Sequence, residues 1–93
     1  MIMSFANDLT RRLYEGLPID GFPPDMLARA LQKLQILNAA NRFRDLEIAL
    51  GVKLDLLTGD RDGKHCLKIL DKGRLCFFWR ESGAHEVEVF LSH

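Results

Sequence analysis

Three cationic residues and one histidine in the last third of the chain have types and spacing suited to phosphate chemistry: Arg61, Lys68, Arg74 and the terminal His93. RNA can be cleaved through its own 2′-hydroxyl, which requires cations around the phosphorane and groups that donate and accept a proton. An arginine can hold two phosphate oxygens, a lysine can supply a point charge or a proton, and a histidine has an intrinsic pKa suited to acid or base catalysis. We therefore expect Lys68, Arg74 and His93 to be catalytic, with no metal and no cofactor.

Other basic and aromatic residues surround these three, and we expect them to bind RNA or phosphate: Arg61, Lys64, Lys72, Phe78 and Arg80. An exposed aromatic ring can stack on a base or receive a partner's side chain. A simpler interpretation is a solvated strand face, whose cations pair with Glu86 and Glu88, because exposed sheet faces are commonly charged. Arg80 opposite Glu86 would form such a cross-strand pair.

The turn within this region determines which side chains share a face. Asp71-Lys72-Gly73 fits a three-residue hairpin loop with glycine in the left-handed conformation, which pairs Leu70 with Arg74 and Lys68 with Cys76. A two-residue turn on Lys72-Gly73 would instead mix apolar and charged residues across the pair. We expect the three-residue loop.

A further strand follows Ser82-Gly83-Ala84, with Trp79 opposite Val87 and Phe77 opposite Val89. One face of this sheet is then apolar and forms the core: Leu67, Ile69, Leu75, Phe77 and Trp79. The opposite face holds the proposed chemistry: Cys66, Lys68, Leu70, Arg74, Cys76, Phe78, Arg80, Glu86, Glu88, Phe90 and Ser92.

In this register Cys66 and Cys76 lie on a diagonal of adjacent strands, roughly 7–8 Å apart, beyond comfortable disulfide geometry. We expect both thiols to be free. A zinc site would need further ligands, and His65 points to the other face, so we expect no metal site.

Two amphipathic helices precede the strands, at about residues 7–15 and 24–40, and their apolar faces require a sheet to cover. Residues 1–5 could form a first strand. Residues 42–57 are ambiguous, and we interpret them as a loop with a short strand or helical turn. The sequence therefore predicts an α+β fold in which a small antiparallel or mixed sheet packs against two N-terminal helices.

The chain has 93 residues, enough for one domain spanning residues 1–93, and no net charge. Residues 1–52 balance six cations with six anions, residues 53–80 carry seven cations and four anions, and residues 81–93 carry three anions. Zero net charge argues against a free-standing, high-affinity nucleic-acid binder but allows a local RNA site. The sequence shows no signal peptide and no membrane-spanning stretch, so we expect a cytoplasmic protein.

The residues described above, together with others along the chain, resemble the HigB branch of the RelE-type toxins of bacterial toxin–antitoxin pairs. The resemblance extends from the start of the chain to its end: Met1-Ile2, Ser4-Phe5, Asn38-Ala39-Ala40, Asp45-Leu46, Leu54, Leu57, Gly59-Asp60-Arg61, Gly63, Arg74-Leu75-Cys76-Phe77, Trp79, Val87-Glu88-Val89 and His93.

The resemblance implies a RelE-like fold and a toxin that cleaves messenger RNA on the translating ribosome without a metal. A HigA-like helix-turn-helix antitoxin would neutralise it, and the toxin would contact operator DNA only through that antitoxin. Arg74 matches the family's phosphate-stabilising arginine, Lys68 a position usually held by arginine, Arg61 a basic loop position, and His93 the terminal histidine.

The chain also departs from the family, which typically ends in Asp-Tyr-His where this chain has Leu91-Ser92-His93. Lys72-Gly73 replaces a polar pair, and residues 49–52 replace a proline-rich loop. An alternative is therefore a catalytically weakened member that mainly binds its antitoxin and regulates the operon. Inhibition of another target, such as a topoisomerase, belongs to related toxins on this fold and stays open.

Overall fold

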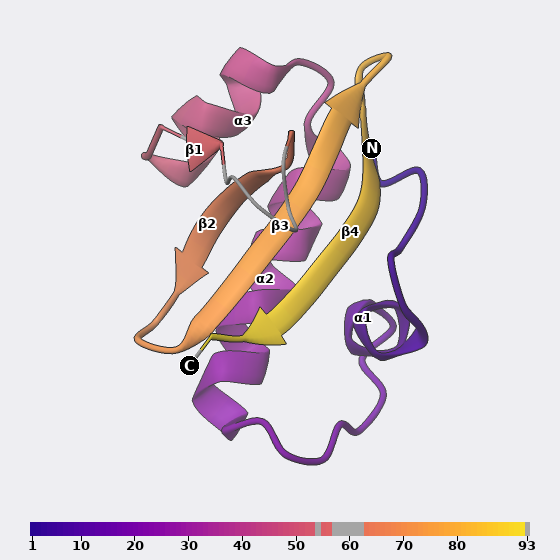
Figure 1. Ribbon diagram of the computed structural model, residues 1–93, viewed down its shortest axis with the longest axis vertical. Coiled ribbons are helices and arrows are strands. Elements are labelled where there is room, and N and C mark those ends of the chain that lie inside the picture. The colour runs from indigo at the N-terminus through magenta and orange to yellow at the C-terminus, as the bar shows by residue number, and fades with distance from the viewer. Residues whose placement is uncertain (54, 57–62, 93) are drawn as a thin grey trace.

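The computed structural model describes residues 1–53, 55–56 and 63–92, with the side chains of residues 55 and 56 excluded. The described part forms three helices and a four-stranded antiparallel sheet in the order β1-β2-β3-β4 (Figure 1). The elements are α1 (Asp8–Tyr14), α2 (Pro24–Ala39), α3 (Phe43–Leu50), β1 (Asp55–Leu56), β2 (His65–Ile69), β3 (Gly73–Arg80) and β4 (Gly83–Leu91). The predicted α+β class is confirmed.

Helix α1 begins where the sequence predicts, because Asn7 caps it. The Asn7 Oδ1 atom accepts a hydrogen bond from the Thr10 amide at 2.9 Å and another from the Thr10 hydroxyl at 2.7 Å. That hydroxyl also accepts a hydrogen bond from the Val89 amide at 3.0 Å, and Thr10 is completely buried. One side chain therefore joins the cap of α1 to β4.

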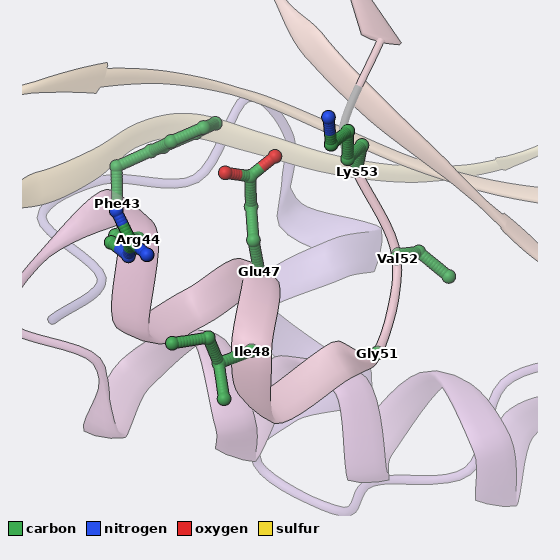
Figure 2. Close-up of a pocket in the computed structure, with 7 residues that line it drawn as sticks. All are labelled: Phe43, Arg44, Glu47, Ile48, Gly51, Val52 and Lys53. Carbon is green, nitrogen blue, oxygen red and sulfur yellow. The ribbon is translucent and has the colours of Figure 1, made fainter.

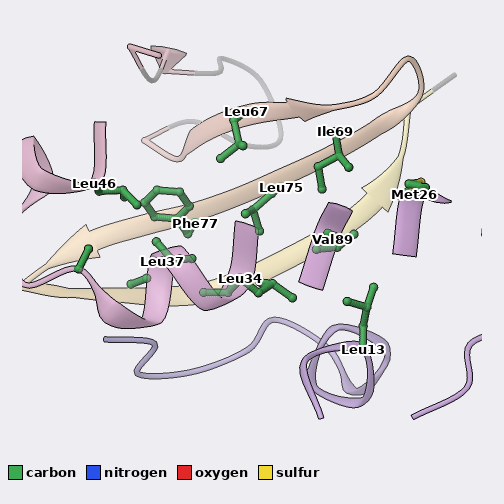
Figure 3. Close-up of a cluster of buried hydrophobic side chains, with 14 residues drawn as sticks. Leu13, Met26, Leu34, Leu37, Leu46, Leu67, Ile69, Leu75, Phe77 and Val89 are labelled. Atoms are coloured by element: carbon green, nitrogen blue, oxygen red, sulfur yellow. The ribbon is translucent and has the colours of Figure 1, made fainter. Parts of the chain in front are cut away.

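Helix α2 extends over residues 24–39, close to the predicted bounds, with proline in its first turn where a missing amide hydrogen costs nothing. Its buried residues recur at helical spacing: Met26, Ala30, Leu34 and Leu37. Figure 3 shows Leu34 and Leu37 pointing toward Leu75 and Phe77 of β3. This contact between helix and sheet forms the centre of the core.

The ambiguous region contains a third helix, α3, followed by the two-residue strand β1. Leu46 anchors α3 in the core with no exposed surface. Gly51 ends the helix with a φ of 71°, the left-handed conformation that glycine adopts readily. The expectation of only two helices is corrected by this element.

The first five residues do not form a regular strand, contrary to the prediction. They make two isolated parallel bridges with β4, between Ile2 and Ala84 and between Phe5 and Val87. Glu86 of β4 lies between the bridged positions and has a φ of 51°. The segment nevertheless covers the outer edge of β4.

The hairpin of β2 and β3 has a register different from the predicted one. Lys68 lies opposite Arg74, Cys66 lies opposite Cys76, and Ile69 lies opposite Gly73. The loop is therefore residues 70–72, one residue earlier than predicted. Because the register differs by two residues, each side chain keeps its predicted face.

Gly73 is required for close packing and does not adopt the predicted left-handed conformation. A Cβ atom at this position would lie 2.8 Å from the Ile69 carbonyl oxygen and 2.8 Å from the Met26 methyl carbon. The positive φ of 53° belongs instead to Leu70.

The register of β3 and β4 also differs from the prediction. Leu75 lies opposite Val89, and beyond a bulge Trp79 lies opposite Ala84. The connecting turn has only two residues, Glu81 and Ser82, both with positive φ as a type I′ turn requires. Phe90 rather than Ser92 is consequently opposite Arg74.

Candidate functional site

Lys68 and Arg74 form the centre of the candidate site, on the sheet face turned away from the helices. They lie directly opposite each other on β2 and β3. The Lys68 side chain is exposed, and the half-buried Arg74 donates a hydrogen bond from Nη1 to the Gly73 carbonyl at 3.0 Å. Among the described residues, no carboxylate forms an ion pair with either cation.

This arrangement is electrostatically unfavourable by itself. Directly opposite side chains on antiparallel strands have Cβ atoms about 4.5–5.5 Å apart, and like charges in such positions destabilise the sheet. An anion bound between the two side chains would offset the repulsion. The pair is therefore suited to a phosphate group, which an arginine can bind through two oxygens.

Lys64, one of the predicted RNA-binding residues, has internal partners. It is 7% exposed, and its Nζ atom donates to the Glu86 carbonyl at 3.1 Å and lies 3.9 Å from Glu88 Oε1. The same ammonium is 5.3 Å from the centroid of the Phe78 ring. These contacts give Lys64 a role in holding the sheet face together.

Phe78 and Arg80 lie beside Lys64. The guanidinium carbon of Arg80 is 5.0 Å from the Phe78 ring centroid, and its Nη2 atom is 3.6 Å from Glu86 Oε2. The predicted pairing of Arg80 with Glu86 is thus present, although Gly83 is the residue opposite Arg80. The basic face consequently has two parts: a paired part near Arg80, and an unpaired part at Lys68 and Arg74, which form no ion pair with a described carboxylate.

The end of the described chain approaches the unpaired part. The Ser92 amide donates a hydrogen bond to the Lys72 carbonyl at 2.6 Å, which joins the C-terminal segment to the loop before Arg74. Lys72 itself is exposed. The expected roles of Arg61 and His93 concern positions outside the described residues.

The two cysteines form a disulfide, so the prediction of free thiols is wrong. The Cys66 and Cys76 sulfur atoms are 1.97 Å apart, and their Cα atoms are 4.2 Å apart. The predicted diagonal followed from the incorrect register, whereas the actual register places the two residues directly opposite each other. The disulfide is next to the Lys68–Arg74 pair and joins the two strands that carry it.

A groove along α3 was not anticipated from the sequence, because residues 42–57 gave no clear pattern. Figure 2 shows the residues that line it: Phe43, Arg44, Glu47, Ile48, Gly51, Val52 and Lys53. In this view Glu47 and Lys53 extend toward the sheet, whereas Ile48 points away from it and is 68% exposed.

His65 connects α3 to the sheet. Its ring centroid is 4.5 Å from that of Phe43 and 6.0 Å from that of Phe77. Burial lowers the pKa of His65, and the charge of Glu47 opposes this effect in part. The His65 Nδ1 atom is buried and has no hydrogen-bond partner among the residues that the structure describes.

Two features are absent from the described part of the chain. No group of three potential metal-ligating side chains occurs there. No helix in that part is both long and apolar enough to cross a membrane.

The fold and the site define a small RelE-like α+β protein with two opposed cations, Lys68 and Arg74, on the sheet face turned away from the helices. Comparison with protein families matches residues 3–92 to the RelE-like toxin of the type II toxin–antitoxin system HigB. The chain belongs to this family of HigB-like toxins, as the sequence resemblance indicated. Membership implies an antitoxin partner. A comparison with curated proteins gave no match.

Proposed function

We propose that this toxin is a ribosome-dependent endoribonuclease that cleaves translated messenger RNA without a metal. The observation that carries the proposal is the Lys68–Arg74 pair, two cations directly opposite each other without a carboxylate partner among the described residues. Family membership supports the same function.

In the proposed reaction the RNA 2′-oxygen bonds to phosphorus while the bond from phosphorus to the 5′-oxygen breaks. Arg74 holds the oxygens of the scissile phosphate, and Lys68 stabilises the charge of the phosphorane or protonates the leaving 5′-oxygen. His93 accepts the proton that the 2′-hydroxyl loses in this scheme, or donates one to the 5′-oxygen while Lys68 accepts the other, and Arg61 holds a flanking phosphate. Charge stabilisation and proton transfer by these groups would replace metal catalysis.

The proposed partners are the ribosome with its messenger RNA and a HigA-like helix-turn-helix antitoxin. Operator DNA would be contacted only through that antitoxin, and the toxin would act in the cytoplasm. A small helix-turn-helix protein encoded by the neighbouring reading frame would support this assignment.

Induction of the chain in bacteria tests the nuclease directly. The wild type is expected to stop growth and to produce new 5′ ends within translated messages, mapped by primer extension. The Arg74→Ala variant is the matched control and should produce neither effect at equal soluble protein. Unchanged translation and intact messages in cells that accumulate folded wild-type protein would contradict the proposal.

A second candidate function is a weakened member that mainly binds its antitoxin, and Leu91 favours it. Leu91 lies opposite Gly73 and packs against the core, where the family typically has an acidic residue. Strand alternation places Ser92 on the other side, with Phe90 and the basic pair. Ser92→Tyr therefore restores the family phenol without disturbing the core, and a gain of about 10²-fold or more in cleavage would support weakening. If the wild type is already active and Ser92→Tyr cleaves at the same rate, the weakened-member hypothesis is excluded.

A further inference from the structure

Three lysines from separate elements line one small hollow at the β2 side of the sheet. Lys33 comes from α2, Lys53 from the segment after α3, and Lys68 from β2. The hollow has a volume of about 250 Å³, and Leu50 and Val52 contribute apolar walls. Among the described side chains that line it, none is acidic.

The lysines of this hollow differ in their surroundings from Arg11, Lys64 and Arg80. Arg11 lies 2.6 Å from Asp8, and Lys64 and Arg80 also have carboxylates nearby. Within the described ranges, no carboxylate forms an ion pair with Lys33, Lys53 or Lys68. A cleft lined by charges of one sign and apolar walls concentrates its field on a counter-ion.

We propose that this lysine hollow binds a backbone phosphate of the RNA substrate next to the scissile phosphate. The inference rests on the proposed nuclease function and adds Lys33 and Lys53 to the RNA path. Lys68 belongs both to the hollow and to the pair with Arg74. One RNA strand can therefore contact Arg74, cross β2 at Lys68 and continue toward α2 and α3.

The donors of the hollow suit phosphate. Three ammonium groups line it and no described lining side chain is acidic, so an anionic group suits it better than an uncharged base. Ammonium groups act as compact point charges and suit a phosphate that needs no bidentate recognition. An acidic protein segment has similar charge, but continuity with the Lys68–Arg74 pair favours RNA.

Salt-dependent RNA binding by single variants tests the inference. The probe is a fluorescent, single-stranded, twelve-nucleotide RNA with 2′-O-methyl groups, which prevent cleavage. Lys33→Gln and Lys53→Gln should each lower the slope of log affinity against log salt by about 0.7 and weaken binding about fivefold at 0.1 M salt. Arg12→Gln is the matched control, because it removes one exposed cation from α1, which packs beside β4 at the opposite edge from β1.

The conservative variant Lys53→Arg keeps the charge and should bind RNA like the wild type, and circular dichroism verifies the fold of every variant. Slopes equal to that of Arg12→Gln would overturn the inference, as would the absence of RNA binding by the wild type. An effect on binding of poly-glutamate but not of RNA would overturn it in favour of an acidic protein partner.

Messenger cleavage in cells is measured separately for the same variants. If the wild type cleaves messages but the lysine variants bind RNA unchanged, the proposed phosphate site in the hollow is refuted and the nuclease function is not. Loss of RNA binding in the lysine variants, when the wild type cuts no message, would refute the nuclease and leave the hollow as an RNA site.

Discussion

Arg74 is the residue on which the proposed chemistry most depends, since its guanidinium forms no ion pair with a described carboxylate and it lies opposite Lys68. Replacing it with alanine should lower the rate of cleavage of ribosome-bound message by about 10²–10³-fold, the usual cost of removing one preorganised donor to a developing anion. Arg74→Lys should recover only part of the rate, because an ammonium cannot make the bidentate contact. Arg12→Gln is the control and should keep the wild-type rate in the same assay.

Strand alternation explains why Lys68 and Arg74 could be predicted to share a face although the predicted pairing was wrong. The register error was two residues, and an even shift leaves every side chain on its own face. The same error separated Cys66 from Cys76, because a disulfide depends on which residues are directly opposite. Faces can therefore be read from the sequence pattern, whereas partners require the turn geometry.

The helix α1 depends on its link to β4 through Thr10. In the Thr10→Val variant the Val89 amide would lose its acceptor in the buried interior, and the free energy of unfolding should fall by about 1–3 kcal/mol. Urea denaturation followed by circular dichroism measures this change. Thr10→Ser keeps the hydroxyl, so its free energy of unfolding should fall by less. An equal fall in the two variants would contradict the hydrogen-bond explanation.

The hairpin of β2 and β3 carries the Lys68–Arg74 pair and is closed by a disulfide between residues separated by ten positions. Reduction should lower the free energy of unfolding by about 2–3 kcal/mol, the cost expected for a short closed loop. Urea denaturation with and without a thiol reductant measures it. The Cys66→Ala/Cys76→Ala double variant should be insensitive to the reductant, and equal sensitivity in this variant would show that the reductant acts elsewhere.

The elements differ in how far the sequence predicted them, for reasons of length and turn chemistry. Helix α2 has four buried positions at helical spacing, a strong periodic signal. Helix α3 has eight residues and only Leu46 buried, too little periodicity for an assignment. Glu81 and Ser82 form a turn with positive φ although neither is glycine. The sequence therefore carried no sign that the turn has two residues.

On the described part of the sheet, cations that contact carboxylates lie apart from cations that do not, although the chain has no net charge. Contacts with carboxylates hold Lys64 and Arg80 near β4. Lys68 and Lys53, on the side of β2 and α3, have no such contacts within the described ranges. Sequence charge counts located the excess of cations in residues 53–80, but only the fold shows which of them stay available.

Packing of α3 on the sheet makes the stability of the whole chain dependent on pH through His65. Burial lowers the pKa of His65 in the folded state, while the unfolded chain keeps a value near 6.5. As the pH falls below about 6.5, the unfolded state therefore binds more protons than the folded state. The contribution of neutral His65 to the free energy of unfolding is complete above this pH and declines on acidification. The free energy of unfolding should be lower at pH 5.5 than at pH 7.5.

Urea denaturation at the two pH values measures the decline, and His65→Phe should reduce it, because a phenyl ring can pack against Phe43 and Phe77 without taking up a proton. His85→Gln removes a histidine but keeps His65 and its ring contacts, and it is the control. A decline of unchanged size in His65→Phe would assign the pH dependence to other groups. A smaller decline only in that variant would identify the contact of α3 with the sheet as the acid-sensitive part of the fold.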